Sequence, residues 1–323
     1  MEFIKKFMEL TRGYTLLVTF ASCCIIYSYA HYSENFSMIN FILLIIGLCC
    51  VHLGANLYDD YKDVQRQLQC GKSLEDVAFD AYIPKAMPIR NRVFSIPQVR
   101  HIINALFVIA IAIGVSFTIT SGWHVLIYML LGGIMAVSYP YSSRFNCAEI
   151  IVGLVFGPLM IMGGYYALTG GYNSSLLILS FTMFFATLTL LHAKNIMDWE
   201  FDVKDGKKTL AILTGSKENA IKLLAIIMSI PYIIVVLGVL ANEFNPKMLY
   251  VFLTLPIAAK LIASMKDYIA IKDVEFKPRW YWGFFENWKN IKDRGIDFFM
   301  FRFYLARNFS FFFALIAAIG AMH

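Results

Sequence analysis

The chain has 323 residues, of which 59% are hydrophobic and 15% are charged, and its mean hydropathy is +0.63. Ordinary soluble domains carry about 25% charged and about 45–50% apolar residues, so one soluble core of this size cannot hide so much apolar surface. Six cysteines are too few for a disulfide scaffold, and the apolar runs lack the heptads of a coiled coil. The composition therefore predicts a polytopic membrane protein.

Nine stretches are long and apolar enough to cross a bilayer as helices, for which about 20 residues is usual. In chain order they are Tyr14–Ala30, Phe36–Ala55, His101–Thr120, Trp123–Tyr139, Ile150–Thr169, Ser174–Ala193, Leu223–Ala241, Met248–Ser264 and Asn308–Met322. The runs are continuous rather than alternating, which excludes the strands of a membrane barrel. We therefore predict an all-α integral membrane protein, with nine transmembrane helices in one bundle and a single domain over residues 1–323.

The basic residues orient this predicted bundle. If the N-terminus is cytoplasmic, all of the 28 Lys and Arg residues except Lys247 fall on the cytoplasmic side. Because Lys and Arg concentrate on that side of membrane proteins, we predict a protein of the cytoplasmic membrane with its N-terminus inside and its C-terminus outside. The net charge of +6 then reflects membrane topology and does not indicate binding to nucleic acid.

Two long polar segments lie on the predicted cytoplasmic side. The first covers about residues 56–100 and the second about residues 194–222, and they open at Asn56 and Asn195, four apolar stretches apart. This repetition predicts two related four-helix halves with a ninth helix added.

The first polar segment begins Asn-Leu-Tyr-Asp-Asp-Tyr-Lys-Asp at Asn56. If the preceding helix continues, Asn56, Asp60 and Asp63 share one face, and Asp59 lies beside them. We call these four residues the first Asp motif.

The second polar segment repeats the pattern. Asn195, Asp198 and Asp202 again share one helical face, with spacings of three and seven residues from the Asn. These three residues form the second Asp motif.

Carboxylates stacked on one helical face repel one another, so each motif needs a compensating cation. Mg²⁺ suits them because it takes carboxylate oxygens and keeps positions for water and substrate phosphates. We predict that both motifs together bind Mg²⁺ and clamp a diphosphate, with Asp60, Asp63, Asp198 and Asp202 as the catalytic carboxylates. Lys194, Lys207 and Lys208 add donors for phosphate oxygens.

Either motif alone is also explained as the solvated end of a transmembrane helix, since polar residues there need no function. Two motifs at equivalent positions, each led by Asn, favour a functional site, because ionisable clusters near the membrane are usually functional.

These residues resemble the UbiA superfamily of intramembrane prenyltransferases over nearly the whole chain. The first Asp motif, in its NLxxDYxD form, resembles the 1,4-dihydroxy-2-naphthoate branch. The family pattern DxxxDxxxGKxT matches Asp198, Asp202, Gly206, Lys207 and Thr209. The paired Asp motifs are the specific part of this resemblance.

Three further stretches support the resemblance. Tyr139-Pro140 with Arg144 resembles the YPxxxR stretch after the fourth helix of the family, and residues 153–164 are similar to its fifth helix. Arg12 resembles the Arg of the RPxTL that opens the first helix. The resemblance implies that Tyr139 and Arg144 bind the diphosphate, and it adds Arg12 to the residues that contact the acceptor.

One stretch departs from the family. Where the family has RPLxxGxIS, Met87 replaces the Arg, and Asn91, which tolerates left-handed backbone, is assigned to the Gly position. Lys85, Arg90 and Arg92 are then the alternative basic residues of this loop for the diphosphate.

His52 and His192 precede Asn56 and Asn195 by four and three residues, so both are expected to face the cleft. Acceptor binding is one interpretation, and hydrogen-bonded packing is the other. Residues 266–307 contain three Trp and many charges, which predicts an amphipathic stretch in the headgroup layer. A docking surface for a partner protein is the alternative.

We therefore predict an Mg²⁺-dependent polyprenyltransferase that binds a polyprenyl diphosphate and a small aromatic acceptor. The resemblance indicates 1,4-dihydroxy-2-naphthoate, hence menaquinone synthesis, and leaves 4-hydroxybenzoate, a porphyrin or a glycerol phosphate as alternatives. A cation-coupled transporter, from a different class, needs carboxylates near the bilayer centre, whereas the Asp residues here lie outside the apolar stretches. A soluble prenyl-chain synthase, suggested by Asp59–Asp63, is excluded by the nine stretches.

Overall fold

The computed structural model describes residues 2–74, 87–142, 147–270 and 275–322. Within these residues nine helical segments are long and apolar enough to span a membrane, as the sequence predicts. They are Gly13–Ala30 (η1 and α2), Met38–Gln69 (α3), Ile96–Ser121 (α5), His124–Ser142 (α6), Ala148–Thr169 (α7, η2 and α8), Ser174–Met197 (α9), Lys217–Leu240 (α12), Pro246–Ile269 (η3 and α13) and Asp297–Ala321 (α15). The described part of the chain contains no β-strand.

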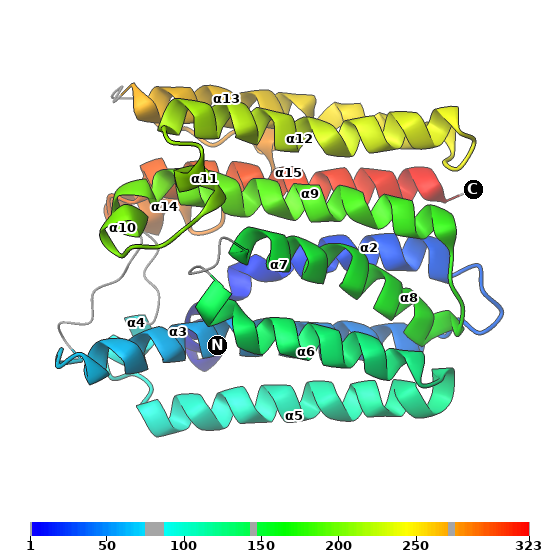
Figure 1. Cartoon of the computed structure of the whole chain (residues 1–323), viewed down its shortest axis with the longest axis horizontal. Helices are drawn as coiled ribbons and strands as arrows, with labels where there is room; N and C mark the ends of the chain where they lie inside the picture. The colour runs from blue at the N-terminus through cyan, green and yellow to red at the C-terminus, as the bar shows by residue number, and fades with distance from the viewer. Residues whose placement is uncertain (1, 75–86, 143–146, 271–274, 323) are drawn as a thin grey trace.

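The nine segments lie alongside one another in one bundle (Figure 1). Helices α9 and α15 form its centre, since 67% and 72% of the residues in their most apolar windows are buried. In α5 and α6 the buried share is 11%, so these two helices present most of their apolar side chains outward. This outer surface is what a lipid environment requires.

The remaining helices are short. They are α1 (Glu2–Leu10), α4 (Met87–Arg90), α10 (Trp199–Lys204), α11 (Leu210–Leu213), η4 (Trp280–Trp282) and α14 (Trp288–Asp293). Helices α4, α10, α11 and α14 gather at one end of the bundle, and the C-terminus lies at the other (Figure 1). Both polar segments therefore reach the same end of the bundle.

Local hydrogen bonds explain where several helices begin. Ser95 accepts a hydrogen bond from the backbone of Gln98, whose side chain accepts one from the Ser95 backbone N–H, so α5 starts with a capping box. At the starts of α9, α11 and α12, backbone N–H groups donate hydrogen bonds to the side chains of Asn173, Thr209 and Ser216, respectively. These caps satisfy donors that have no partner inside the helix.

The fifth spanning segment bends in its middle. Residues Val155–Leu159 form a π-helical turn that contains Pro158, and Gly157 has non-helical backbone angles. A Cβ at Gly157 would lie 2.8 Å from the backbone nitrogen of Phe184 and from the carbonyl oxygen of Ser180. Only glycine permits this approach, which brings α7 and its polar first turn against α9.

Two predicted boundaries are corrected by the structure. Helix α3 continues to Gln69, so the first Asp motif lies inside a helix and not in a loop. The last helix begins at Asp297 rather than Asn308, and it contains two buried arginines, Arg302 and Arg307. The hydropathy pattern excludes an Arg from an apolar stretch, so it predicts a start after Arg307. Both guanidinium groups nevertheless lie inside the bundle, because backbone carbonyl groups accept their hydrogen bonds.

The segment before the last helix packs on that helix. Arg307 donates to the carbonyl oxygen of Phe284 and to the carboxylate of Glu286, and Asn308 donates to the carbonyl oxygen of Trp282. Trp280 is 89% exposed. The predicted headgroup layer is therefore compatible with η4, but residues 297–307 belong to the bundle.

Candidate functional site

A cavity of about 630 Å³ runs between the helices, within the size range of ligand pockets in proteins. Its walls come from the spanning segments α2, α3, α5, α6, α7 to α9 and α15, and they are mostly apolar. Most of the polar lining residues, among them Arg12, Thr15, His52, Asn56, Tyr139 and Lys194, lie toward the end of the bundle that carries the short helices. The cavity thus has one polar end and a long apolar body.

Arg12 holds the first Asp motif at the polar end. Its guanidinium donates to both oxygens of Asp60, through Nε at 3.2 Å and through Nη2, and Nη2 also lies 3.0 Å from Asp59 Oδ2. Burial opposes the charge of Arg12, but Asp60 and Asp59 outweigh it and raise the pKa of Arg12 well above its ordinary value. The guanidinium therefore stays charged, next to two buried carboxylates.

The backbone of Arg12 adopts the left-handed conformation, with φ 55° and ψ 43°. This conformation is energetically unfavourable for a residue with a Cβ, and it persists where surrounding contacts hold the backbone in place. Here it lies between α1 and η1 and turns the Arg side chain onto α3.

Two further side chains of the polar end are fixed by hydroxyl groups. Asn56 donates its amide to the carbonyl oxygen of Thr11 and to Thr15 Oγ1, at 3.3 and 3.0 Å. The ring nitrogens of His52 lie 3.1 Å from Thr15 Oγ1 and 2.6 Å from Thr19 Oγ1. His52 therefore lines the cavity with its ring orientation set from both sides.

The second Asp motif lies where α9 ends. Asp198 is the C-cap of α9 and the N-cap of α10, so the predicted straight helical face breaks at this residue. Lys194 Nζ lies 2.6 Å from Asp198, and Lys207 Nζ lies 3.2 Å from Asp202. Burial raises the pKa of Asp202 above its ordinary value, although Lys194 and Lys207 oppose the shift.

Basic partners of both Asp motifs line one cavity. Arg12 and Lys194 both line it, and each is paired with carboxylates of a different motif. Asp63, by contrast, pairs with Arg66 at 2.9 Å and is partly exposed. The structure thus connects Asp59 and Asp60, through Arg12, and Asp198, through Lys194, to the polar end of the cavity.

The donor set fits a hard divalent cation. Among the described residues no three His, Cys, Asp or Glu side chains already form a metal-binding group, and the carboxylates are paired with basic residues instead. Yet Asp198 Oδ1 and Asp202 Oδ2 are buried without a hydrogen-bond partner in the part of the chain that the structure describes. Buried oxygens in this state leave positions for a water or an ion, and carboxylate oxygens are what Mg²⁺ takes.

Several predicted residues lie elsewhere. His192 is fully buried with Nε2 2.9 Å from the carbonyl oxygen of Ala220, so the expectation that it faces the cleft is wrong, and packing accounts for it. Arg90 and Arg92 do not line the cavity. Lys85 and Arg144 lie outside the described residues.

The left-handed position in the loop after α4 is Arg92 (φ 55°), not Asn91. Backbone N–H groups of Arg92 and Val93 donate to the carbonyl oxygens of Ile89 and Pro88, the hydrogen-bond pattern of a helix C-terminus that favours Gly. Arg92 therefore occupies the position at which Gly was expected.

Sequence patterns missed three contributors. Glu149 accepts a hydrogen bond from Asn195 at 2.6 Å, and Tyr14 and Phe303 line the cavity with their rings in edge contact. A single Glu before an apolar stretch was the only available signal for Glu149. Nothing distinguished Tyr14 or Phe303 from the other aromatic residues.

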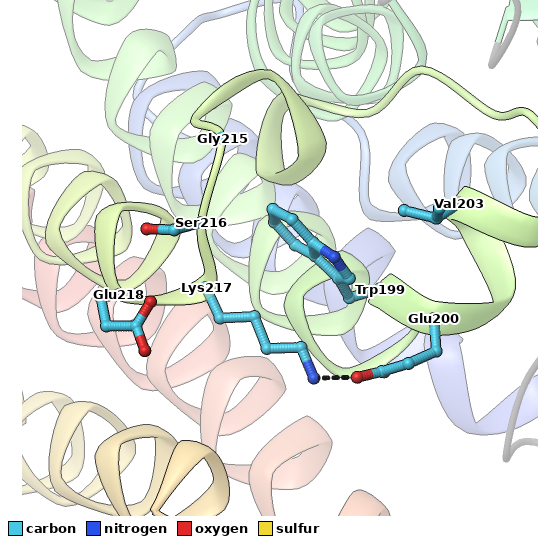
Figure 2. A pocket seen from close by; sticks show the side chains of 7 residues that line it. All are labelled: Trp199, Glu200, Val203, Gly215, Ser216, Lys217 and Glu218. Carbon is cyan, nitrogen blue, oxygen red and sulfur yellow. Dashed lines mark hydrogen bonds and ion pairs between the residues drawn. The ribbon is translucent and has the colours of Figure 1, made fainter.

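A second pocket lies beside α10 (Figure 2) and is lined by Trp199, Glu200, Val203 and residues 215–218. Lys217 and Glu200 pair across it. No residue of either Asp motif lines this pocket, whereas Asn56 and the basic partners Arg12 and Lys194 line the larger cavity, so we assign the site to the larger cavity.

The profile of the UbiA prenyltransferase family matches residues 16–285. The chain belongs to this family. It is similar to the 1,4-dihydroxy-2-naphthoate octaprenyltransferase of Bacillus subtilis (strain 168), with 26% identity over 267 residues and 81% of each chain covered. It is also 26% identical to the digeranylgeranylglyceryl phosphate synthase of Methanosphaera stadtmanae, over 71% of this chain and 77% of that one.

A solved structure shares the fold. A UbiA homologue from Archaeoglobus fulgidus, bound to GPP and Mg²⁺, superposes with a TM-score of 0.57 at 17% identity and covers 94% of this chain and 99% of the other. As a member of this family, the chain is an integral membrane prenyltransferase, which confirms the predicted fold class and enzyme type.

Proposed function

We propose that this enzyme transfers a polyprenyl group from a polyprenyl diphosphate to 1,4-dihydroxy-2-naphthoate, with Mg²⁺, in menaquinone biosynthesis. The chain acts as a single membrane domain over residues 1–323, with its site facing the cytoplasm. The observation that carries this proposal is the cavity, whose polar end is lined by the basic partners of both Asp motifs and whose apolar body has room for a prenyl chain.

The polar end has the groups that ionisation of a prenyl diphosphate needs. Asn56, Asp59, Asp60, Asp63, Asn195, Asp198 and Asp202 would hold Mg²⁺, which would neutralise the charge on the departing diphosphate. Lys194 and Tyr139 line this end, and Lys207 lies beside Asp202. They donate to phosphate oxygens as the C–O bond breaks and charge collects on the diphosphate.

The apolar body of the cavity stabilises the allylic cation that forms when the C–O bond breaks. Loss of diphosphate produces an allylic cation, and the faces of aromatic rings stabilise such a cation. Tyr14, Phe156 and Phe303 line the cavity and are the rings that we assign to this role. The acceptor ring then forms a carbon–carbon bond with the cation and loses its carboxylate as CO₂.

The acceptor assignment rests on the form of the first Asp motif and on the relative from Bacillus subtilis. His52 and Arg12 reach the cavity and are the polar groups that we assign to the acceptor. The archaeal relative makes a digeranylgeranylglyceryl phosphate according to its name, so a glycerol phosphate is the competing acceptor.

The test is an assay of the purified protein. It is incubated with octaprenyl diphosphate and Mg²⁺, and with 1,4-dihydroxy-2-naphthoate, 4-hydroxybenzoate or a glycerol phosphate, and products are identified by mass. We expect a prenylated and decarboxylated naphthoate, and no product after chelation of Mg²⁺. A product from another acceptor alone would contradict the naphthoate assignment and leave the prenyltransferase activity in place.

A further inference from the structure

Glu149 is a buried carboxylate outside both Asp motifs. It lies in the first turn of α7 (Ala148–Leu154), at the start of the fifth spanning segment, and only 1% of its surface is exposed. Its oxygen Oε2 has no hydrogen-bond partner among the described residues. Because burying a carboxylate with one oxygen unpaired costs free energy, stability alone does not account for a Glu here.

The other oxygen of Glu149 joins three elements. Oε1 accepts a hydrogen bond from Asn195 Nδ2 at 2.6 Å and another from the backbone N–H of Leu210 at 2.9 Å. Asn195 lies in α9 and leads the second Asp motif, and Leu210 is the first residue of α11. One atom therefore connects the start of α7 to both ends of the segment that carries Asp198, Asp202 and Lys207.

The contact with Asn195 determines which end of its amide can bind a cation. A carboxylate oxygen only accepts hydrogen bonds, so the NH₂ group of Asn195 must face Glu149. The carbonyl oxygen Oδ1 then faces away from Glu149, and it is the only amide atom that a cation can use. Asn56 in the first motif is held alike, since its NH₂ group donates to Thr11 and Thr15.

The contact with Leu210 holds the loop that carries Lys207. This loop runs from Gly206 to Thr209, and Thr209 caps α11 directly before Leu210. At its other side the backbone N–H of Lys207 donates to the carbonyl oxygen of Asp202, and Lys207 Nζ pairs with the Asp202 carboxylate. With Leu210 held by Glu149, the loop is tied at both sides of Lys207.

We propose that Glu149 is a positioning residue of the prenyl transfer. It orients the amide of Asn195 so that Oδ1 is available to the divalent cation, and it ties the Gly206–Thr209 loop to α7. This role rests on the proposed function, because it acts through the metal and diphosphate site. Glu149 itself contacts neither substrate nor cation.

Three substitutions separate orientation from charge and from packing. Glu149→Gln keeps an oxygen that accepts from both Asn195 and Leu210 but removes the charge. Glu149→Leu has a similar size and no acceptor. Glu149→Asp keeps the charge, but its shorter side chain moves the carboxylate away from at least one of the two donors. If the Glu149→Leu variant does not fold, Glu149→Asp takes its place in the test.

The primary measurement is the affinity for Mn²⁺, used as a probe for Mg²⁺ and followed by electron paramagnetic resonance with inorganic diphosphate present. We expect Glu149→Leu and Glu149→Asp to weaken Mn²⁺ binding by tenfold to a hundredfold, the loss that removal of a charged hydrogen bond predicts. Glu149→Gln should weaken it by less than about tenfold without lowering the unfolding temperature. In steady-state assays KM for the prenyl diphosphate should rise, and KM for the acceptor should stay unchanged.

A double-mutant cycle tests whether Glu149 acts through Asn195. In an Asn195→Leu background, Glu149→Leu should weaken Mn²⁺ binding little further, because residues that act as a unit are not additive. The matched control is Glu243→Leu, which removes a carboxylate that accepts a hydrogen bond from Ser175 at the opposite end of the bundle. It should leave Mn²⁺ binding and prenyl transfer unchanged.

Three results would overturn this role, and the third would overturn the proposed function as well. Equal losses in Glu149→Gln and Glu149→Leu would show that the charge, and not the orientation, is what matters. Unchanged Mn²⁺ affinity in Glu149→Leu, with normal binding by the wild type, would remove Glu149 from the site and leave the proposed function intact. Absence of Mn²⁺ binding and of product in the wild type would instead overturn the proposed function and this role with it.

Discussion

At the scale of single residues, the buried carboxylates near the polar end of the cavity are each paired with a basic side chain. Asp60, Asp198 and Asp202 are almost fully buried, and each has its own basic partner in Arg12, Lys194 or Lys207. Buried carboxylates need such partners, because an uncompensated buried charge costs several kcal/mol (about 3–5). Lys194 and Lys207 are also suited to phosphate oxygens, so the partners of the second Asp motif are the groups that we expect a diphosphate to contact.

The first prediction tests whether the two Asp motifs act as one site. Asp60→Asn and Asp202→Asn each remove a charge with little change in volume, and each should lower kcat by on the order of 10²–10³, the cost of losing charge stabilisation in a transition state. The double variant should lose much less than the product of the single effects. The measurement is product formation against Mg²⁺ concentration, with the exposed Asp293→Asn as the control. A loss of kcat in the double variant that equals the product of the two single losses would contradict a shared site.

At the scale of elements, helix α6 forms one wall of the apolar body. Gly132 and Gly133 both line the cavity, and a Cβ at either position would meet no atom within 4 Å. Glycine is unfavourable in a helix by about 0.5–1 kcal/mol relative to Ala. The two residues therefore leave space that a prenyl chain can use.

The second prediction concerns the length of that chain. Gly132→Leu should favour the helix and fill part of the cavity, so long donors should lose more than short ones. We expect kcat/KM with octaprenyl diphosphate to fall by about tenfold to a hundredfold, the cost of overpacking, and geranyl diphosphate to be affected far less. Ile134→Phe, an exposed position of α6 outside the cavity lining, should change neither. Equal losses for both donors would contradict the placement of the chain along α6.

The third prediction concerns the attachment of residues 282–288 to α15. Arg307 is 1% exposed and donates to Tyr14, Phe284 and Glu286. Arg307→Met should lower the free energy of unfolding by about 1–3 kcal/mol, because the hydrogen bonds of a buried charged group are lost. Thermal unfolding in detergent measures this loss. Lys277→Met breaks an exposed ion pair with Glu275 and should cost about 0–1 kcal/mol, so equal shifts in the two variants would show that the buried contacts contribute nothing.

At the scale of the whole molecule, both Asp motifs reach one end of the bundle (Figure 1). All 28 Lys and Arg residues except Lys247 belong to that side of the predicted topology. The positive-inside rule therefore predicts that this end of the bundle faces the cytoplasm.

The fourth prediction tests this orientation by cysteine labelling. Cys70 is free and exposed just after α3, so an impermeant thiol reagent should reach it only from the cytoplasmic side of membrane vesicles. In a Cys70→Ser background, Lys204→Cys should be labelled from the same side and Lys247→Cys only from the opposite one. Labelling of Cys70 and of position 204 from opposite sides would contradict a single shared site.

Much of this protein followed from the sequence alone. Nine spans, an all-helical fold and the two Asp motifs are properties of local patterns, since hydropathy and helical spacing involve residues close together in the chain. For the same reason the sequence alone places the first Asp motif on one helical face, and α3 continues through it to Gln69.

Tertiary structure alone decided the contacts between residues far apart in the chain. Arg12 and Asp60 are 48 residues apart, and Glu149 and Asn195 are 46 apart, so no periodicity relates them. Hydropathy starts the last predicted span just after Arg307, because an Arg is not apolar. In the structure Arg307 is buried, and it donates hydrogen bonds to Glu286 and to the carbonyl oxygen of Phe284. Likewise His192, expected in the cleft, faces Ala220, because the direction of a side chain in a bundle depends on which helices surround it.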